Sequence, residues 1–175
     1  CQELSETYGV RVVAVESVEA AVRGADVINV ATAGAVSPEI HDEWLKEGVL
    51  LTLPASAALS LDTMKSSRIV VDNWKMYEAY AQELRGLPGG YAANLSGICG
   101  YLMDLVESGE IPQKDIVNLG DVIAGKQECR RNDRERVIFI MDGMPIEDLA
   151  WGYTVYENAK KMGLGTKLNL WEKTR

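Results

Sequence analysis

Histidine and cysteine are scarce in this sequence of 175 residues. It contains one histidine, His41, and three widely spaced cysteines, Cys1, Cys99 and Cys129. The cysteines are too widely spaced for a zinc knuckle, and His41 has no serine or cysteine partner at a recognisable spacing, so neither a structural zinc site nor a Ser–His triad is indicated. An odd number of cysteines also fits no disulfide framework. We therefore expect no metal site, reduced structural thiols and a surface position for His41.

The sequence also has no excess of positive charge and no long apolar run. The 18 basic residues are outnumbered by 26 acidic ones, so the net charge is −8 and no basic stripe is available for a nucleic acid. No apolar stretch approaches the roughly 20 residues that a membrane helix needs, and residues 1–4 (CQEL) do not resemble a signal sequence. These features predict a cytoplasmic protein with small-molecule or protein partners. Because the first residue is Cys1 rather than Met, we expect the sequence to be part of a longer chain.

The glycine fingerprint of a complete dinucleotide-binding fold is missing as well. That fingerprint, Gly-x-Gly-x-x-Gly, follows the first strand, because pyrophosphate needs bare backbone amides at a helix N-terminus. The sequence has one Gly-x-Gly, Gly163-Leu164-Gly165, and it precedes an expected strand rather than a helix. The absence of the fingerprint would argue against dinucleotide binding only if the sequence were the whole chain.

Short apolar runs rich in β-branched residues are present, and they alternate with helical patterns. This alternation predicts an α/β fold with a parallel sheet that is covered on both faces. Residues 25–33 are almost continuously apolar, so we expect this strand to be central and buried on both sides. The expected strands span residues 10–15, 27–30, 49–53, 69–71, 137–141 and 166–170.

Helix start and stop signals predict the segments between these strands. Ser17 and Gly24 bound one short helix, and Ser37-Pro38 and Gly48 bound another over residues 39–46. Residues 74–124 are expected to be mostly helical, with a loop at 86–90 and one helix face formed by residues 116, 119 and 123. Residues 126–136 are predicted to be a solvated loop, with a dimer or domain contact as the alternative. Pro145 and Gly163 bound the best defined helix.

Small and polar residues follow four of the expected strands. In open α/β sheets, ligands lie outside the carboxyl ends of the strands, where small residues let a flat cofactor approach the backbone. The small residues could equally serve only to make tight turns. Asp72 and Asp142 both lie at such strand ends and are candidate acids or bases, with turn or helix capping as the alternative for each. The strand-end segments are residues 31–34, 53–56, 72–74 and 141–144.

Several segments carry a family resemblance in their order and spacing. They are residues 24–33 (GADVINVATA), 43–48 (EWLKEG), 68–72 (RIVVD), 119–125 (LGDVIAG), 143–150 (GMPIEDLA) and 163–166 (GLGT). Together they resemble the ornithine cyclodeaminase and mu-crystallin family over nearly the whole chain, with a longer insert around residues 80–102. The stretches LPAS and DNWK are also similar to the branch of that family that is named after a tyramine oxidase subunit.

The resemblance implies a protein about twice this length that binds NAD or NADP. It implies a Rossmann-like, doubly wound, mostly parallel sheet over residues 1–145, without its first strands and glycine loop, and beginning in the helix after the second strand. A helix and strand over residues 146–175 would return to a substrate and dimerisation domain, so a homodimer is expected. The positions that match the family's cofactor-binding loops are Ala31, Thr32, Ala33, Gly34, Leu53, Pro54, Ala55, Gly143 and Met144.

Two departures from the family pattern bear on activity. Pro54 stands where ornithine cyclodeaminases carry an aspartate, so true cyclodeaminase activity is not expected. Met141-Asp142 replaces the family's polar pair, which makes Asp142 the candidate catalytic acid or base. The resemblance thus implies an NAD(P)-dependent oxidoreductase acting on an amino acid or cyclic imine. The alternative is a non-catalytic binding or accessory protein of the same fold.

Overall fold

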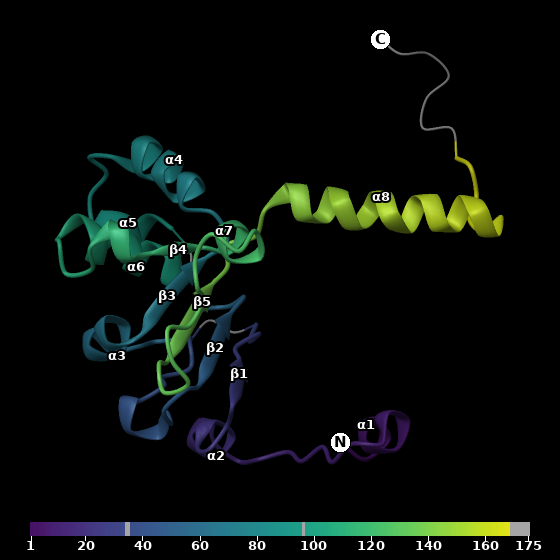
Figure 1. Ribbon diagram of the computed structural model, residues 1–175, viewed down its shortest axis with the longest axis horizontal. Coiled ribbons are helices and arrows are strands. Elements are labelled where there is room, and N and C mark those ends of the chain that lie inside the picture. Colours follow the sequence, from purple (N-terminus) through teal and green to yellow (C-terminus); the bar gives the residue numbers. More distant parts are fainter. Residues whose placement is uncertain (34–35, 96, 169–175) are drawn as a thin grey trace, which may run out of the picture. The chain divides into compact units, whose positions relative to one another are not determined.

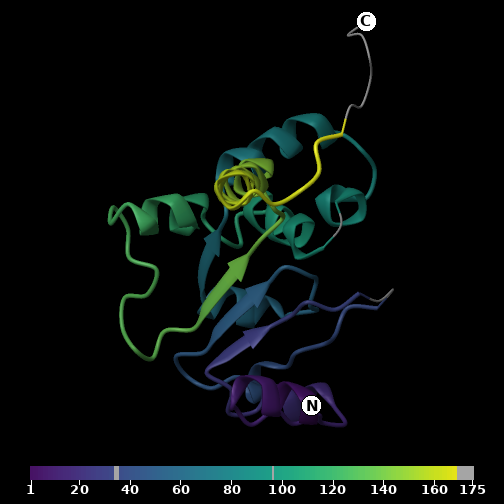
Figure 2. The ribbon, with the colours of Figure 1, turned by 90° about the vertical axis from the view of Figure 1, so that its right-hand side faces the viewer.

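The fold is built on a parallel sheet. The computed structural model describes residues 1–33, 36–95 and 97–168, and the chain divides into two compact units, Cys1–Asp142 and Gly143–Arg175. The described strand pairs in the first unit are all parallel, so the carboxyl ends of the strands point the same way (Figures 1 and 2). In order across the sheet, the strands are β1 (Val27–Asn29), β2 (Leu50–Leu53), β5 (Val137–Ile140), β3 (Arg68–Val71) and β4 (Val117–Asn118). The predicted α/β class with a parallel sheet is confirmed.

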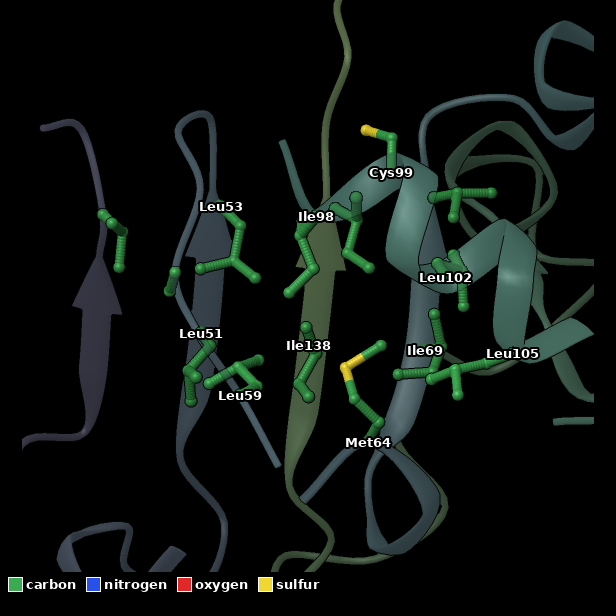
Figure 3. Packing of buried hydrophobic residues seen from close by; sticks show 14 of the residues in the cluster. Leu51, Leu53, Leu59, Met64, Ile69, Ile98, Cys99, Leu102, Leu105 and Ile138 are labelled. Atoms are coloured by element: carbon green, nitrogen blue, oxygen red, sulfur yellow. The ribbon is translucent and has the colours of Figure 1, made fainter. Parts of the chain in front are cut away.

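One face of the sheet carries the main core. Leu51, Ile138 and Ile69 are register partners on β2, β5 and β3, and each is at most 3% exposed (Figure 3). They pack under α3 (Leu61–Ser66) and α6 (Ile98–Glu107), whose residues Met64 and Leu102 are fully buried. Burying one such side chain contributes about 1.5–3 kcal/mol, so this layer fixes α6 against the strands.

The opposite face is covered only in part. A smaller cluster around Val70, Val117 and Val137 packs with residues of α7 (Leu119–Ile123). Toward β1 the cover ends, and Val27 is 58% exposed. Among the described strands, β1 therefore lies at one end of the order, and this face of the sheet is only partly covered there. Here β1 pairs with β2 alone, and its alternation sends only Ile28 into the core.

Two predicted elements are missing or shortened, because whether they form depends on which segments they pair with. Residues 10–15 form no strand; Val10, Val13 and Val15 are about half exposed, and no described strand pairs with them. An extended segment without a partner gains no ladder hydrogen bonds. The helix expected over residues 39–46 is reduced to the 3₁₀ turn η1 (Asp42–Trp44), because Glu39 forms a parallel bridge with Ala58.

The short helix at the start of the first unit follows its sequence signals. Ser17 caps α2 (Val18–Val22) by accepting the Ala20 N–H at 3.1 Å, as predicted. The preceding segment forms α1 (Gln2–Tyr8), in agreement with the helix that the family resemblance places there. Residues 126–136 are largely exposed, as predicted, although Arg136 donates to the Leu45 carbonyl at 2.7 Å.

The middle of the chain is mostly helical, with one exception. It contains α4 (Trp74–Leu84), α5 (Gly90–Asn94) and α6, with the predicted loop between α4 and α5. After the 3₁₀ turn η2 (Gln113–Asp115), however, β4 lies within the segment that was expected to be helical. Ile123, a member of that expected face, is 78% exposed. A two-residue strand is too short to show a period of its own in the sequence.

The second unit consists mainly of one long helix. Helix α8 (Pro145–Met162) begins with Pro145 and ends at Gly163, whose φ of 66° is the left-handed conformation that glycine favours, so both predicted boundaries are confirmed. None of its side chains is buried within the described chain. Residues 166–168 of the expected last strand have no regular structure, and residues 169 and 170 lie outside the described residues. No helix in the described ranges is long and apolar enough to cross a membrane.

Candidate functional site

A cavity of about 230 Å³ opens at the carboxyl ends of β2 and β5. Its walls come from the segment after β1, the loop after β2, the start of α6 and the end of β5. The lining residues are Thr32, Ser37, Leu53, Pro54, Ala55, Ser56, Gly97, Ile98, Cys99, Met141 and Asp142. The cavity therefore lies where parallel α/β sheets bind their ligands.

Backbone hydrogen bonds hold the loop after β2 in place. The Val30 N–H donates to the Thr52 carbonyl at 3.0 Å, and the Ala55 N–H donates to the Val30 carbonyl at 2.9 Å. Pro54 has no N–H to satisfy, so it is tolerated at the turn between these bonds. The side chains of Pro54 and Ala55 are small, and the backbone of the loop is therefore open to the cavity.

Asp72 fixes the backbone where β3 and β5 end. It is 4% exposed, and its two carboxylate oxygens accept the backbone N–H groups of Asn73 and Asp142, both at 2.9 Å. Asn73 then caps α4 by accepting the Lys75 N–H at 3.1 Å. Asp72 thus acts as a turn acceptor, which was the structural alternative to an acid or base role.

Asp142 has a different setting from that of Asp72. Its side chain is on the surface and lines the cavity, where its Oδ1 lies 3.6 Å from the Cys99 sulfur. Burial, together with a hydrogen bond to Asp142, raises the pKa of the Tyr80 hydroxyl. The Asp142 carboxylate is therefore surrounded by protonated donors on its protein side.

Cys99 joins this group to the interior. It lies in the first turn of α6 and is 3% exposed. Its sulfur lies at the carboxyl-terminal end of the strands (Figure 3). Its sulfur lies 3.7 Å from the hydroxyl of Tyr77, a fully buried side chain of α4. Burial raises the pKa of the Cys99 thiol to about 12, and burial likewise raises the pKa of Tyr77. Both groups keep their protons at neutral pH.

The structure brings together five of the candidate cofactor-binding and catalytic residues. Thr32, Leu53, Pro54, Ala55 and Asp142 line the same cavity.

Other named residues do not line it. Ala31 and Ala33 flank Thr32 without being among the lining residues, and Gly34 lies outside the described residues. Gly143 and Met144 belong to the second unit. His41 lies at the surface, as expected, and packs edge-on against Trp44 with ring centroids 4.4 Å apart.

Sequence reasoning missed the contribution of α6. Gly97, Ile98 and Cys99 form one wall of the cavity, yet Cys99 was assigned only a structural role. A usable signal was present, because Cys99 precedes Leu102 by three positions and so shares the buried side of a helix. Nothing in the sequence, however, indicates that the start of this helix docks at the end of β5.

Comparison with known proteins agrees with this architecture. The family model described as the ornithine cyclodeaminase/mu-crystallin family matches residues 1–163. Alanine dehydrogenase of Archaeoglobus fulgidus is 29% identical over 145 residues, which cover 79% of this chain and 39% of that protein. Delta(1)-pyrroline-2-carboxylate reductase of Bacillus cereus is 27% identical over 168 residues, which cover 95% of this chain and 47% of that protein.

A solved structure shows the same fold. The structure of Thermococcus litoralis Delta(1)-pyrroline-2-carboxylate reductase in complex with NADH and L-proline superposes with a TM-score of 0.70 at 26% identity. The match covers 95% of this chain and 48% of that one. The chain thus spans less than half the length of the relatives it matches. With its family model matched over most of its length, the chain belongs to the ornithine cyclodeaminase/mu-crystallin family.

Proposed function

We propose that this chain forms part of the cofactor domain of an NAD(P)-dependent oxidoreductase that acts on an amino acid or cyclic imine. The observation that carries the proposal is the cavity at the ends of β2 and β5, lined by small residues and by Asp142. Relatives described as an alanine dehydrogenase and as a Delta(1)-pyrroline-2-carboxylate reductase support the reaction class. The substrate within that class is left open by these names.

The residues present fit one part of a dinucleotide. A volume of about 230 Å³ is below the roughly 300–1,000 Å³ of whole small-molecule sites, so the cavity would take one end of the cofactor. Thr32 and the loop of Pro54 and Ala55 would bind that end, because small side chains leave their backbone accessible. When bound, the cofactor would supply or accept the hydride, while the protein orients the reactants.

Asp142 is the proposed catalytic acid or base. Its carboxylate faces the cavity and could exchange a proton with the nitrogen of an amine or imine substrate. Its environment of protonated donors on one side and open cavity on the other would hold it in position.

Hydride transfer by the full-length protein tests this proposal. NADH and NADPH would each be mixed with a panel of imine substrates. The panel includes the cyclic imine that corresponds to proline, and a mixture of pyruvate and ammonia. The loss of reduced-nicotinamide absorbance would be followed. The proposal predicts turnover with at least one substrate, reduced by about 10²-fold or more in Asp142→Asn, the range typical of acid–base groups. A folded protein that is inert over a broad amine and imine panel would refute it.

A second candidate is a binding or accessory protein of the same fold. It is favoured by Pro54, which forms the cavity wall where the family resemblance implies a carboxylate. In this alternative, the protein copurifies with an amine oxidase and has no turnover of its own. Strong activity of the purified protein alone excludes it.

The second unit supports a proposal about assembly. Leu149, Trp151 and Tyr153 of α8 are each at least 65% exposed within the described chain, which is unusual for large apolar residues. We infer that residues 146–175 join the rest of a substrate and dimerisation domain and that the full-length protein is a homodimer. Sedimentation equilibrium of the full-length protein tests this, and a monomer at all concentrations contradicts it.

A further inference from the structure

The cavity has an unusual charge distribution. Asp142 is the only charged side chain among its described lining residues, and the other polar ones are hydroxyls and a thiol. A single carboxylate attracts cations and repels anions in a partly enclosed space, where charges interact more strongly than in water. The carboxylate end of an amino acid is therefore disfavoured here, whereas its nitrogen cation is favoured.

Neighbouring groups contact both the backbone and the carboxylate of Asp142. Its backbone N–H is fixed by Asp72 at 2.9 Å, and its Oδ1 accepts a hydrogen bond from the Cys99 thiol at 3.6 Å. Burial and the nearby Asp142 carboxylate together raise the pKa of the Tyr80 hydroxyl, so this group also stays protonated beside Asp142. The groups next to Asp142 thus come from the residue after β3, from α4 and from α6.

Cys99 is the central member of this arrangement. A thiol has one proton, and a carboxylate is the stronger acceptor, so the Cys99 proton goes to Asp142. The Tyr77 hydroxyl, 3.7 Å away on the interior side, then donates to the sulfur. The resulting chain, Tyr77 to Cys99 to Asp142, points each proton toward the cavity. Because the thiol is buried and stays protonated, it acts as a hydrogen-bond donor and not as a nucleophile.

We infer that Cys99 is a positioning residue that holds the Asp142 carboxylate as a subsite for the ammonium or iminium nitrogen of the substrate. The inference concerns the same site as the proposed function and rests on it for the identity of the substrate. Its structural basis is the thiol–carboxylate contact between α6 and the end of β5, together with the lack of any other charged residue in the described cavity wall.

The competing explanation is that Cys99 merely fills the core. The two explanations predict opposite orders of substitution. A donor role predicts that Cys99→Ser, which keeps a hydroxyl donor, preserves function better than Cys99→Val, which is apolar. A packing role predicts the reverse, because a buried hydroxyl costs more than a methyl group.

The first test measures kcat and KM for the amine or imine substrate in the full-length protein. Because a hydrogen bond to a charged group is stronger than one between neutral groups, we expect Cys99→Val and Cys99→Ala to lose about tenfold or more in kcat/KM, mainly through KM, and Cys99→Ser to lose about threefold or less. Cys129→Ala is the matched control, since Cys129 packs on the opposite face of the sheet, and it should change nothing. Equal losses in Ser, Ala and Val variants, or an unaffected Val variant, would overturn the positioning role.

The second test needs no activity. The S–H stretching band of Cys99 is recorded by infrared spectroscopy in a full-length protein whose Cys1 and Cys129, and any further cysteines, are replaced by serine. We expect the band to move to higher frequency in Asp142→Ala, because the donated hydrogen bond is lost. An unmoved band overturns the inference even in an active enzyme. A band that moves in an inactive protein instead rejects the proposed function and the substrate subsite, and retains only the Cys99–Asp142 pairing.

Discussion

Asp72 accepts a hydrogen bond from the backbone N–H of Asp142 through its Oδ2 at 2.9 Å, although the two residues are 70 positions apart. They follow β3 and β5, which are neighbours in the sheet with Val71 opposite Ile140. The bond continues the association of these strands beyond their ladder, one residue after Val71 and two residues after Ile140. It also fixes the backbone from which the proposed catalytic carboxylate projects.

Removing the Asp72 carboxylate should destabilise the protein. Asp72→Ala leaves the N–H groups of Asn73 and Asp142 without their acceptor, and a hydrogen bond to a charged group contributes about 1.5–3 kcal/mol. Urea unfolding of the full-length protein measures this loss. Asp72→Asn keeps one side-chain acceptor and should lose less. Equal stability of wild type and Asp72→Ala would show that the bond contributes nothing.

Gly100 should tolerate no side chain. A Cβ at this position would lie 2.6 Å from the Tyr91 carbonyl oxygen and 2.8 Å from Ala92 Cα, where α5 packs against α6. Gly100→Ala should therefore cost about 1–3 kcal/mol, as overpacking does. The control is Gly120→Ala in α7, where a Cβ meets nothing within 4 Å. Alanine is the better helix former by about 1 kcal/mol, so the control should be neutral or stabilised in the same unfolding assay.

Alkaline pH should weaken the fold through Cys99. Burial raises the pKa of its thiol to about 12, from an ordinary value of 9.0. Between these values the unfolded chain loses the proton first, so the free energy of unfolding falls as pH rises, by at most about 4 kcal/mol. Below pH 9 the contribution is fully present.

The measurement is the difference in unfolding free energy between wild type and Cys99→Ser as a function of pH. Wild type should lose stability more steeply above pH 9, since serine does not titrate there. Tyr77→Phe should also lose less unfolding free energy above pH 9 than wild type does, because burial raises the pKa of Tyr77 as well. Parallel curves for wild type and Cys99→Ser would contradict the buried, protonated thiol.

Elements with strong local signals were predictable from the sequence. The strands β2, β3 and β5 follow apolar, β-branched runs, and α8 begins and ends at the predicted Pro145 and Gly163. These signals act within a few residues, so no tertiary information is needed to read them. The loops that end β2 and β5 were identified for the same reason, and they form two walls of the cavity.

Features that depend on tertiary pairing were not predictable. The position of β1 at the sheet edge depends on which strands lie beside it, and residues 39–46 lose their helix to the bridge between Glu39 and Ala58. The contact between Cys99 and Asp142 joins positions 43 residues apart. A single sequence carries no periodicity over such a distance, so the cavity wall formed by the start of α6 was missed.

The most direct test of this account is a titration of the full-length protein with NADH, followed by tryptophan quenching, in wild type and Ala55→Phe. Ala55 lines the cavity, so a phenyl group there should block the cofactor and raise Kd about tenfold or more, which corresponds to about 1.4 kcal/mol. Ala21→Phe, on the exposed side of α2, is the matched control and should bind as wild type does. Saturable binding that is lost only in Ala55→Phe is the result we predict, and unchanged binding in a folded Ala55→Phe protein would contradict the assignment of this cavity to the cofactor.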